Sequence, residues 1–509
     1  MKNTQSVSHF GRAFWNIHSS LPDSQNLDSS MIWMDKFDDP ENNSNVKAVY
    51  FQPSPGINSN KLFVLNELSV NTVNFGIDPY SLGLWESQLF KVNLDSDVVL
   101  TAIGKNYKFF RFSGQAYAMS GAADFQEIAL LLASIVQVVE DYEGVISLEQ
   151  LAQTLSLELS LKPHLFESVA KVRAVKCLLK SISETVNSDK ISEIDIYSAP
   201  NLRFLGAREP WTNILRLSAM QSAAVIGGSD GFLNVAYDFN SKNQGARVSR
   251  NSLEVLLQES HLAQVQDPLC GSEVLESMTE QLCEKSWVLF TEILKKGGLK
   301  DCLRSGWIFE IIDENEKHEN LSVLNRDKVL TGINQYPLVS SLDAAFPLVE
   351  KEEVIDIERW WSQNTLTDGF EKLCDVKRFV PKSLAQVYEQ QQMQTQKISE
   401  KSRLIPVLVE SSECKNKKWS TLRNLLSLTG FSIEEKNLEQ AESVPLVLLM
   451  ASDPDGDFVK NSMEKLKKSS KTKVFWVGDR LIQGFDGCVG ESQNMIEISD
   501  QIYSILGGQ

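Results

Sequence analysis

The sequence predicts an α/β protein with two parallel sheets that follow each other along the chain. Three observations support this prediction. Short β-type runs alternate with amphipathic helical segments over about 250 residues, the same alternation resumes after residue 403, and a charged, glutamine-rich helical stretch lies between them. Strand, helix and strand in succession imply parallel pairing, because a parallel crossover needs the intervening helix.

Composition limits the function classes. The chain has 509 residues, enough for about three domains, and 42% of them are apolar, as in an ordinary globular protein. Lys and Arg number 50 against 67 Asp and Glu, a net charge of −17. We therefore expect binding neither to nucleic acid nor to a membrane, since both present phosphate-rich anionic surfaces.

Two further absences indicate a cytoplasmic location. The longest apolar stretch, residues 128–139, is too short to cross a bilayer, and the first residues lack the apolar core of a secretory signal. The seven cysteines are odd in number and have no CxxC spacing, which indicates reduced thiols and no metal site.

Residues 1–45 are polar and lack a regular pattern, so they are predicted to form an arm that lies on a partner's surface and buries its large aromatic side chains there. Residues 46–342 hold the first alternation. The strands predicted in it are residues 47–51, 73–77, 98–103, 107–112, 155–159, 194–198 and 232–237.

The helices between these strands carry end signals. Asp124 and Glu127 form a predicted capping box, and Gly144 ends that helix. A second helix has Pro210 in its first turn and stops at Gly227. The commonest closed form at this length is a (β/α)8 TIM-type barrel. Only three residues separate the predicted strands 98–103 and 107–112, too few for a crossover helix, so the barrel is predicted to be shortened.

Residues 343–402 are predicted to be a helical connector, and residues 403–509 a second domain. Predicted strands 404–409, 431–434, 446–450, 473–477 and 484–489 alternate there with helices near 419–428, 458–468 and 494–506. This pattern indicates a five-stranded doubly wound domain of the flavodoxin-like kind.

Three motif blocks resemble the cobalamin-dependent acyl-CoA mutases, the family of methylmalonyl-CoA mutase. The first runs from Glu209 to Arg216 (EPWTNILR) and continues in Ala223 to Asp230 (AAVIGGSD). The second lies between Gln258 and Ser277, with QES, DP, GS and ES in order, and the third between His164 and Leu179, with LF and K-x-RA. The resemblance implies a barrel that holds an acyl-CoA along its axis, and a C-terminal domain that carries adenosylcobalamin.

The cobalt-ligand motif of that family, DxHxxG, is degenerate here. Its Asp, His and Gly positions fall on Glu413, Lys415 and Lys418, and no histidine follows His318. A protonated amine offers cobalt no lone pair. The family's catalytic segment HCQTSG falls on residues 197–202, where Tyr197 stands at the histidine position.

The predicted strand 107–112 carries bulky side chains where the family has small residues beside the substrate. These are Phe109, Phe110, Arg111 and Phe112. Those that point inward are expected to fill the axial tunnel.

The chain is thus similar to the small, non-catalytic subunit of a heterodimeric methylmalonyl-CoA mutase. The resemblance implies a large catalytic partner that holds adenosylcobalamin and interconverts methylmalonyl-CoA and succinyl-CoA, with no catalytic, cofactor-binding or metal residue expected in this chain. Two alternatives stay open. The first alternative is an active acyl-CoA mutase with atypical cobalamin binding that uses Tyr197. The second is a partner or chaperone of another cobalamin-dependent mutase.

Overall fold

A computed structural model describes residues 31–34, 48–51, 72–81, 88–91, 100, 103–104, 107–206, 209–238, 244–337, 371–375, 383–398, 400–441, 444–467 and 472–506. The chain divides into two compact units. The first comprises residues 1–205, 213–317 and 356–383, and the second residues 206–212, 318–355 and 384–509. Each unit is described by itself.

The sheet of the first unit contains seven strands, all parallel, in the order in which they occur along the chain. They are β1 (Met31–Met34), β2 (Ala48–Phe51), β3 (Thr72–Ile77), β5 (Lys108–Ser113), β6 (Leu155–Leu161), β7 (Asp195–Pro200) and β8 (Gly231–Phe232). A separate antiparallel pair joins β4 (Gln88–Lys91) to β9 (Glu371–Asp375). Strictly sequential order is typical of a barrel, whereas a doubly wound sheet reverses its strand order.

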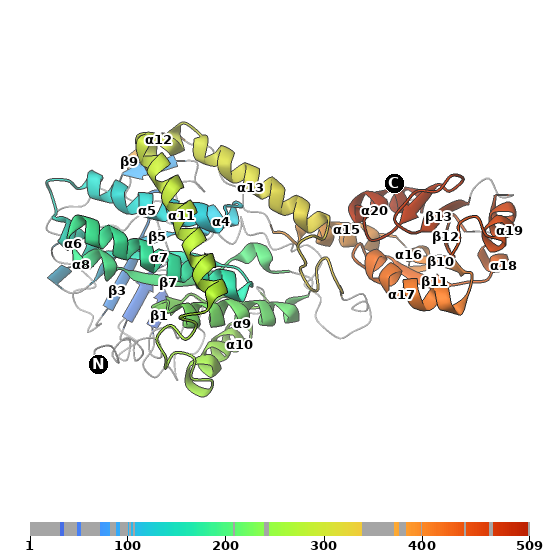
Figure 1. Cartoon of the computed structure of the whole chain (residues 1–509), viewed down its shortest axis with the longest axis horizontal. Coiled ribbons are helices and arrows are strands. Elements are labelled where there is room, and N and C mark those ends of the chain that lie inside the picture. Colours follow the sequence, from blue (N-terminus) through green and yellow to red (C-terminus); the bar gives the residue numbers. More distant parts are fainter. Residues whose placement is uncertain are drawn as a thin grey trace. The chain divides into compact units, whose positions relative to one another are not determined.

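The helices of the first unit are α4 (Gln115–Met119), α5 (Asp124–Asp141), α6 (Leu148–Gln153), α7 (Leu165–Val186), α8 (Asp189–Ser192), α9 (Pro210–Gly227), α10 (Gln244–Glu254), α11 (Glu273–Lys295) and α12 (Leu299–Arg304); α13 (Trp307–Leu324) continues into the second unit. Helix α11 packs against both α5 and α7 (Figure 1). The predicted α9 is confirmed, and Gly228 follows it with a φ of 77°.

Two strand predictions are wrong, and one strand lies where an irregular arm was predicted. Leu100 and Ile103 are helical, as is Gly104, where the apolar run predicted a strand over residues 98–103. About 30 residues therefore separate β3 from the parallel β5, room enough for a crossover, and the reason to expect a shortened barrel disappears. Strand β8 is limited to two residues, and β1 lies inside the predicted arm.

The predicted capping box of α5 is also wrong. Ala123 is the N-cap, and its backbone N–H donates to the side chain of Gln126 at 2.8 Å. Asp124 is the first helical residue, and Glu127 turns away from the helix start toward β6, where Ser160 N donates to it at 2.8 Å. A stronger set of buried partners decides where this carboxylate points.

The second unit holds a five-stranded parallel sheet in the order β11-β10-β12-β13-β14. Its strands are β10 (Leu404–Val409), β11 (Ser432–Glu435), β12 (Leu446–Met450), β13 (Lys473–Val477) and β14 (Gly487–Val489). The helices include α15 (Gln386–Gln396), α16 (Glu400–Arg403), α17 (Ser412–Ser427), α18 (Leu438–Ala441), α19 (Asp457–Leu466) and α20 (Met495–Ile505). This strand order is that of flavodoxin-like sheets.

The five predicted C-terminal strands are confirmed: β10, β12 and β13 have the predicted limits, and β11 and β14 differ from theirs by one and three residues. Each central strand is a short apolar run that is buried on both faces, which is typical of parallel sheets covered by helices. Across the described part of the chain, none of the helices has the length and apolar character of a membrane span.

Candidate functional site

The first sheet has one apolar and one polar face, because leucine alternates with polar residues along β6. The register places Arg111 beside Ser156, and Ser113 beside Glu158, which in turn lies beside Tyr197. The opposite face carries Phe110, whose ring lies 5.8 Å from that of Tyr142 at the end of α5. The apolar face therefore packs against helices, and the polar face is the one that would line a barrel axis.

An ion pair lies buried on this polar face. The Nε atom of Arg111 is 3.2 Å from Oε2 of Glu158, and the two side chains are 0% and 4% exposed. Ser113 Oγ donates to Oε1 of the same carboxylate at 3.0 Å, and Ser113 N donates to Asp78 at 2.7 Å. Burial raises the pKa of both carboxyls, and Arg111 opposes that rise at Glu158. The chain's own charged groups therefore occupy this face.

Strand β5 divides its bulky residues between the two faces. Phe110 and Phe112 lie on the helix side, where Phe112 stacks on Tyr80 at 5.7 Å. By strand alternation, Phe109 shares the polar face with Arg111, and all four bulky residues are buried. Two of the four thus contribute volume to the face that the sequence predicts to be filled.

A second buried cluster lies at the carboxyl end of β6. Lys171 Nζ is 2.5 Å from Glu127 Oε2, 2.9 Å from Asp124 Oδ1 and 2.6 Å from the carbonyl oxygen of Ser160. Lys162 contributes a second ammonium group 3.4 Å from Asp124. The cluster links α5, β6 and α7, and sequence reasoning missed it; its one signal was the lysine of the K-x-RA pattern.

The pKa values of the two carboxyls in this cluster are shifted in opposite directions. Burial raises the pKa of Glu127 to about 7, although Lys171 and the N–H of Ser160 oppose the rise. Burial acts in the same sense on Asp124, but there the ammonium groups of Lys162 and Lys171 prevail and hold its pKa well below the usual range. Asp124 is therefore the permanent anion of the cluster.

The shift at Glu127 predicts a pH-dependent stability. The folded chain keeps this proton between the ordinary pKa of 4.5 and about 7, whereas the unfolded chain has lost it. The stabilising contribution is complete below pH 4.5 and disappears as the pH rises through 7. Relative to Glu127→Gln, whose amide mimics the neutral acid, the unfolding free energy of the wild type should fall by about 3 kcal/mol between pH 4.5 and pH 8. Urea unfolding at several pH values measures this, and a constant difference would contradict it.

Tyr197, at the family's histidine position, lies on β7 and is buried. Its hydroxyl donates to Asp195 Oδ2 at 3.4 Å, and Asp195 pairs with Lys108 at 3.3 Å. Asp195 is the first residue of β7, so this hydroxyl is directed toward the amino end of the strand. In barrel enzymes the chemistry takes place at the carboxyl ends.

The three residues at the cobalt-ligand positions lie in the first turns of α17, which begins after the N-cap Ser411. Glu413 is exposed and pairs with Lys417 at 2.7 Å. The ammonium of Lys415 pairs with Glu435 and lies 4.9 Å from the centre of the Trp419 ring. Both side chains have local partners on the surface of the second unit.

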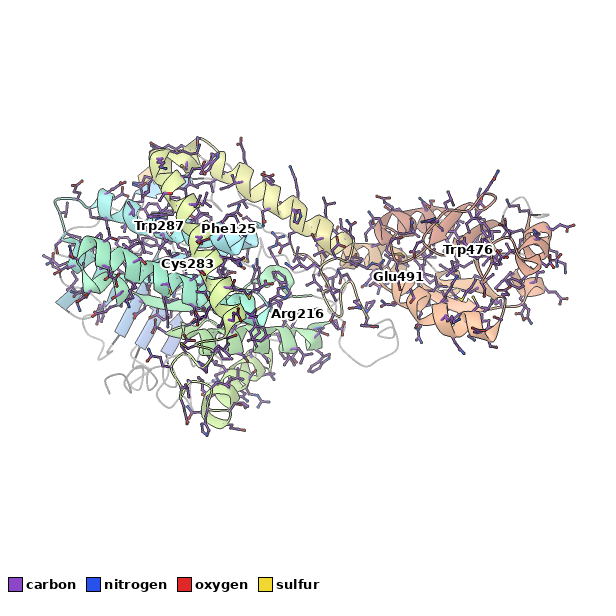
Figure 2. All side chains as sticks on the ribbon, viewed as in Figure 1. Phe125, Arg216, Cys283, Trp287, Trp476 and Glu491 are labelled. Atoms are coloured by element: carbon purple, nitrogen blue, oxygen red, sulfur yellow. The ribbon has the colours of Figure 1, made fainter. Side chains whose placement is uncertain are left out.

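Lys418 is different, because it reaches the carboxyl ends of two central strands. Its Nζ donates to the carbonyl oxygens of Ala451, just after β12, at 3.0 Å and of Val477, at the end of β13, at 3.4 Å. It also lies 5.2 Å from the centre of the Trp476 ring, which Figure 2 labels. In doubly wound folds, ligands bind outside these strand ends. Here a side chain of the protein occupies that place.

Glu410 lies beside Lys418's partners, at the carboxyl ends of the strands. It follows β10, and Ser452 N donates to its carboxylate at 2.6 Å. Strands β10 and β12 flank the point where the strand order reverses. Within the residues that the structure describes, no group of three or more His, Cys, Asp and Glu side chains could hold a metal ion.

The second unit also contains a polar cavity of about 370 Å³, which no sequence motif indicated. Two hydrogen bonds join residues of its wall. Arg326 donates to the backbone carbonyl oxygen of Glu491, and Thr421 donates to the side-chain carboxylate of Glu491 at 3.2 Å. The lining residues are Asn325, Arg326, Val329, Asn334, Gln335, Tyr336, Ser420, Thr421, Asn424, Leu425 and Glu491.

Comparisons with known proteins agree with the motif blocks. The sequence profile described as methylmalonyl-CoA mutase matches residues 100–363, just over half of the chain. The methylmalonyl-CoA mutase small subunit of Streptomyces virginiae is 27% identical over 228 residues, which cover 44% of this chain and 37% of that protein. The small subunit of Propionibacterium freudenreichii subsp. shermanii is 24% identical over 288 residues, 53% of this chain and 43% of that protein.

A methylmalonyl-CoA mutase of Rhizobium meliloti is 26% identical over 300 residues, which cover 56% of this chain and 42% of that protein. The chain therefore spans less than half the length of each of these relatives in the matched segments.

Proposed function

Because this chain belongs to the methylmalonyl-CoA mutase family, we propose that it is a small, non-catalytic subunit that supports a large catalytic partner in a heterodimer. The observation that carries this proposal is Lys418, whose ammonium lies on the strand ends where a doubly wound domain binds its ligand. The small-subunit names of two relatives support the same role and a large-subunit partner.

The residues of this chain do not fit adenosylcobalamin. An ammonium group at position 415 offers cobalt no lone pair, and no histidine follows His318. The proposal therefore assigns the cofactor, and the interconversion of methylmalonyl-CoA and succinyl-CoA, to the partner in the cytoplasm. Residues 403–509 are then a degenerate cobalamin-binding domain. The stretch 343–402 is not helical throughout, because β9 lies inside it and pairs with β4 of the first unit.

The first sheet does not favour acyl-CoA binding in this chain either. Sequential parallel order supports a (β/α)8 barrel within residues 46–342, with β1 added from residues 31–34. On its polar face, Arg111 and Glu158 neutralise each other in the interior. We assign contact with the partner to the arm, now limited to residues 1–30.

The isolated chain should therefore bind neither adenosylcobalamin nor succinyl-CoA. Equilibrium dialysis with the cofactor and calorimetry with the acyl-CoA are expected to show no saturable binding up to about 100 μM, equivalent to about 5.5 kcal/mol. A family member that carries an intact DxHxxG motif serves as the positive control. Retention with the visible spectrum of a histidine-ligated cobalamin would contradict the proposal.

Coexpression with a large mutase chain from the same source tests the partnership separately. The two chains are expected to elute together, and mutase activity is expected to depend on both. If this chain elutes alone and the large chain is fully active without it, the subunit role is wrong, whatever the binding measurements give.

A further inference from the structure

Two cysteines from distant parts of the chain meet where two helices of the first unit pack together. Cys177 lies on α7 and Cys283, labelled in Figure 2, on α11, which packs against α7 (Figure 1). Cys283 Sγ lies 3.7 Å from the carbonyl oxygen of Ala174, one turn before Cys177 on α7, so the two thiols are neighbours where α11 packs against α7. Both are reduced, and Cys177 is exposed to solvent.

The surroundings give the two thiols different properties. Arg173, one turn before Cys177, is held in place by Asp267 at 3.0 Å and Glu276 at 2.7 Å. The neighbouring Cys283 thiol lowers the pKa of Cys177 to about 6. Arg173 contributes less to this lowering, and burial and the two carboxylates oppose it. The same contact raises the pKa of Cys283. One thiol is thus an exposed nucleophile, and the other is its protonated neighbour.

We propose that Cys177 and Cys283 form a redox-active dithiol site that is oxidised by low-molecular-weight disulfides of the glutathione type. An exposed thiol beside a second, half-buried thiol is the arrangement that such an exchange requires, with the first cysteine attacking and the second resolving. None of the proposed subunit functions uses either residue, so the inference is independent of them.

The reaction takes place in two exchange steps. The Cys177 thiolate attacks one sulfur of oxidised glutathione, forms a mixed disulfide and releases one glutathione thiolate. Cys283 then loses its proton to solvent, attacks the Cys177 sulfur and releases the second glutathione thiolate. Counted from the dithiol, the protein loses two electrons and two protons, one proton when the Cys177 thiolate forms and one from Cys283. The two released glutathione thiolates take up two protons from solvent, so one glutathione disulfide becomes two glutathione thiols.

The resulting bond would connect α7 to α11. The two cysteines are roughly 100 residues apart in the chain, so the crosslink closes a long loop of the unfolded state. Oxidation should therefore raise the unfolding midpoint of the first unit by roughly 5 to 10 °C. It also fixes the packing of α11 against α7.

Treating the full chain with oxidised glutathione at pH 6.5 tests the inference. Peptide mapping without reductant is expected to recover one product, a Cys177–Cys283 disulfide, and Cys177 should react about fivefold faster than an ordinary thiol. In Cys283→Ser, a lasting mixed disulfide should accumulate at position 177. In Cys177→Ser, Cys283 should stay reduced.

Cys270→Ser is the matched control, because Cys270 is also an exposed cysteine and lies outside the pair. This variant should form the same disulfide at the same rate as the wild type. The inference is wrong if Cys270 reacts while Cys177 does not, or if the wild type accumulates a stable mixed disulfide in place of the intramolecular bond.

Discussion

Arg111→Ala is expected to destabilise the first unit by about 3 to 5 kcal/mol, because it leaves the buried carboxylate of Glu158 without its cation. The guanidinium is fully buried and lies 3.2 Å from that carboxylate. Ser113 remains as a hydrogen-bond donor, but one neutral hydroxyl does not compensate a buried charge. Urea unfolding of the full chain, followed by circular dichroism, measures the loss.

The control for this prediction removes both charges and keeps their volume. The double variant Arg111→Met with Glu158→Met should lose much less than either single variant, since well-packed apolar residues often replace a buried ion pair without cost. A loss below about 1 kcal/mol in Arg111→Ala would mean that water reaches Glu158, and that the polar face is open.

Lys171→Ala is expected to cost a similar amount, about 3 to 5 kcal/mol at pH 8, because two buried carboxylates lose their shared ammonium. The side chain is 1% exposed and contacts Glu127, Asp124 and the carbonyl oxygen of Ser160. The loss should be smaller near pH 6, where Glu127, with a pKa of about 7, is free to take a proton. Denaturant unfolding at both pH values measures the difference.

Lys162→Ala is the matched control on the same cluster. Its ammonium lies 3.4 Å from Asp124 and its side chain is 11% exposed, so water replaces part of its contribution. A smaller cost than for Lys171→Ala is expected, because Lys162 pairs with one carboxylate and Lys171 with two. Equal losses for Lys162→Ala and Lys171→Ala would contradict the view that burial decides the cost.

The C-terminal domain was the most predictable part of the fold. Its strands β10, β12 and β13 are short apolar runs bounded by polar residues, and the sequence located each of them at its observed limits. The alternation of leucine with serine and glutamate located the start of β6 at Leu155, although the strand continues two residues beyond its predicted end, to Leu161. In such segments, local pattern and tertiary environment demand the same structure.

Local pattern failed where distant contacts decide the outcome. The run near Leu100 is apolar enough for a strand, yet Leu100 and Ile103 are helical. Glu127 has the spacing of a capping residue, yet its partner is Lys171, 44 residues away. Such a pairing has no signature in the residues next to it, so the sequence could not reveal it.

For the candidate site, the sequence predicted only which ligand residues are replaced. The sequence showed that Lys415 and Lys418 stand where a cobalt ligand and a glycine were expected, and the prediction that the chain binds no cobalamin awaits its test. It could not show that Lys418 extends to the carbonyl oxygens of Ala451 and Val477. A lysine on a helix start is usually solvated, and only the folded sheet reveals this one as an internal partner.

The pairing of Arg111 with Glu158 also constrains how this protein can evolve. A change to small, neutral side chains at these positions requires two substitutions, and either substitution alone leaves one buried charge unpaired. Selection would remove each unstable single variant before the second substitution arose. The two positions should therefore covary among descendants of the same gene. The buried ion pair should also persist, because no single substitution removes it without destabilising the fold.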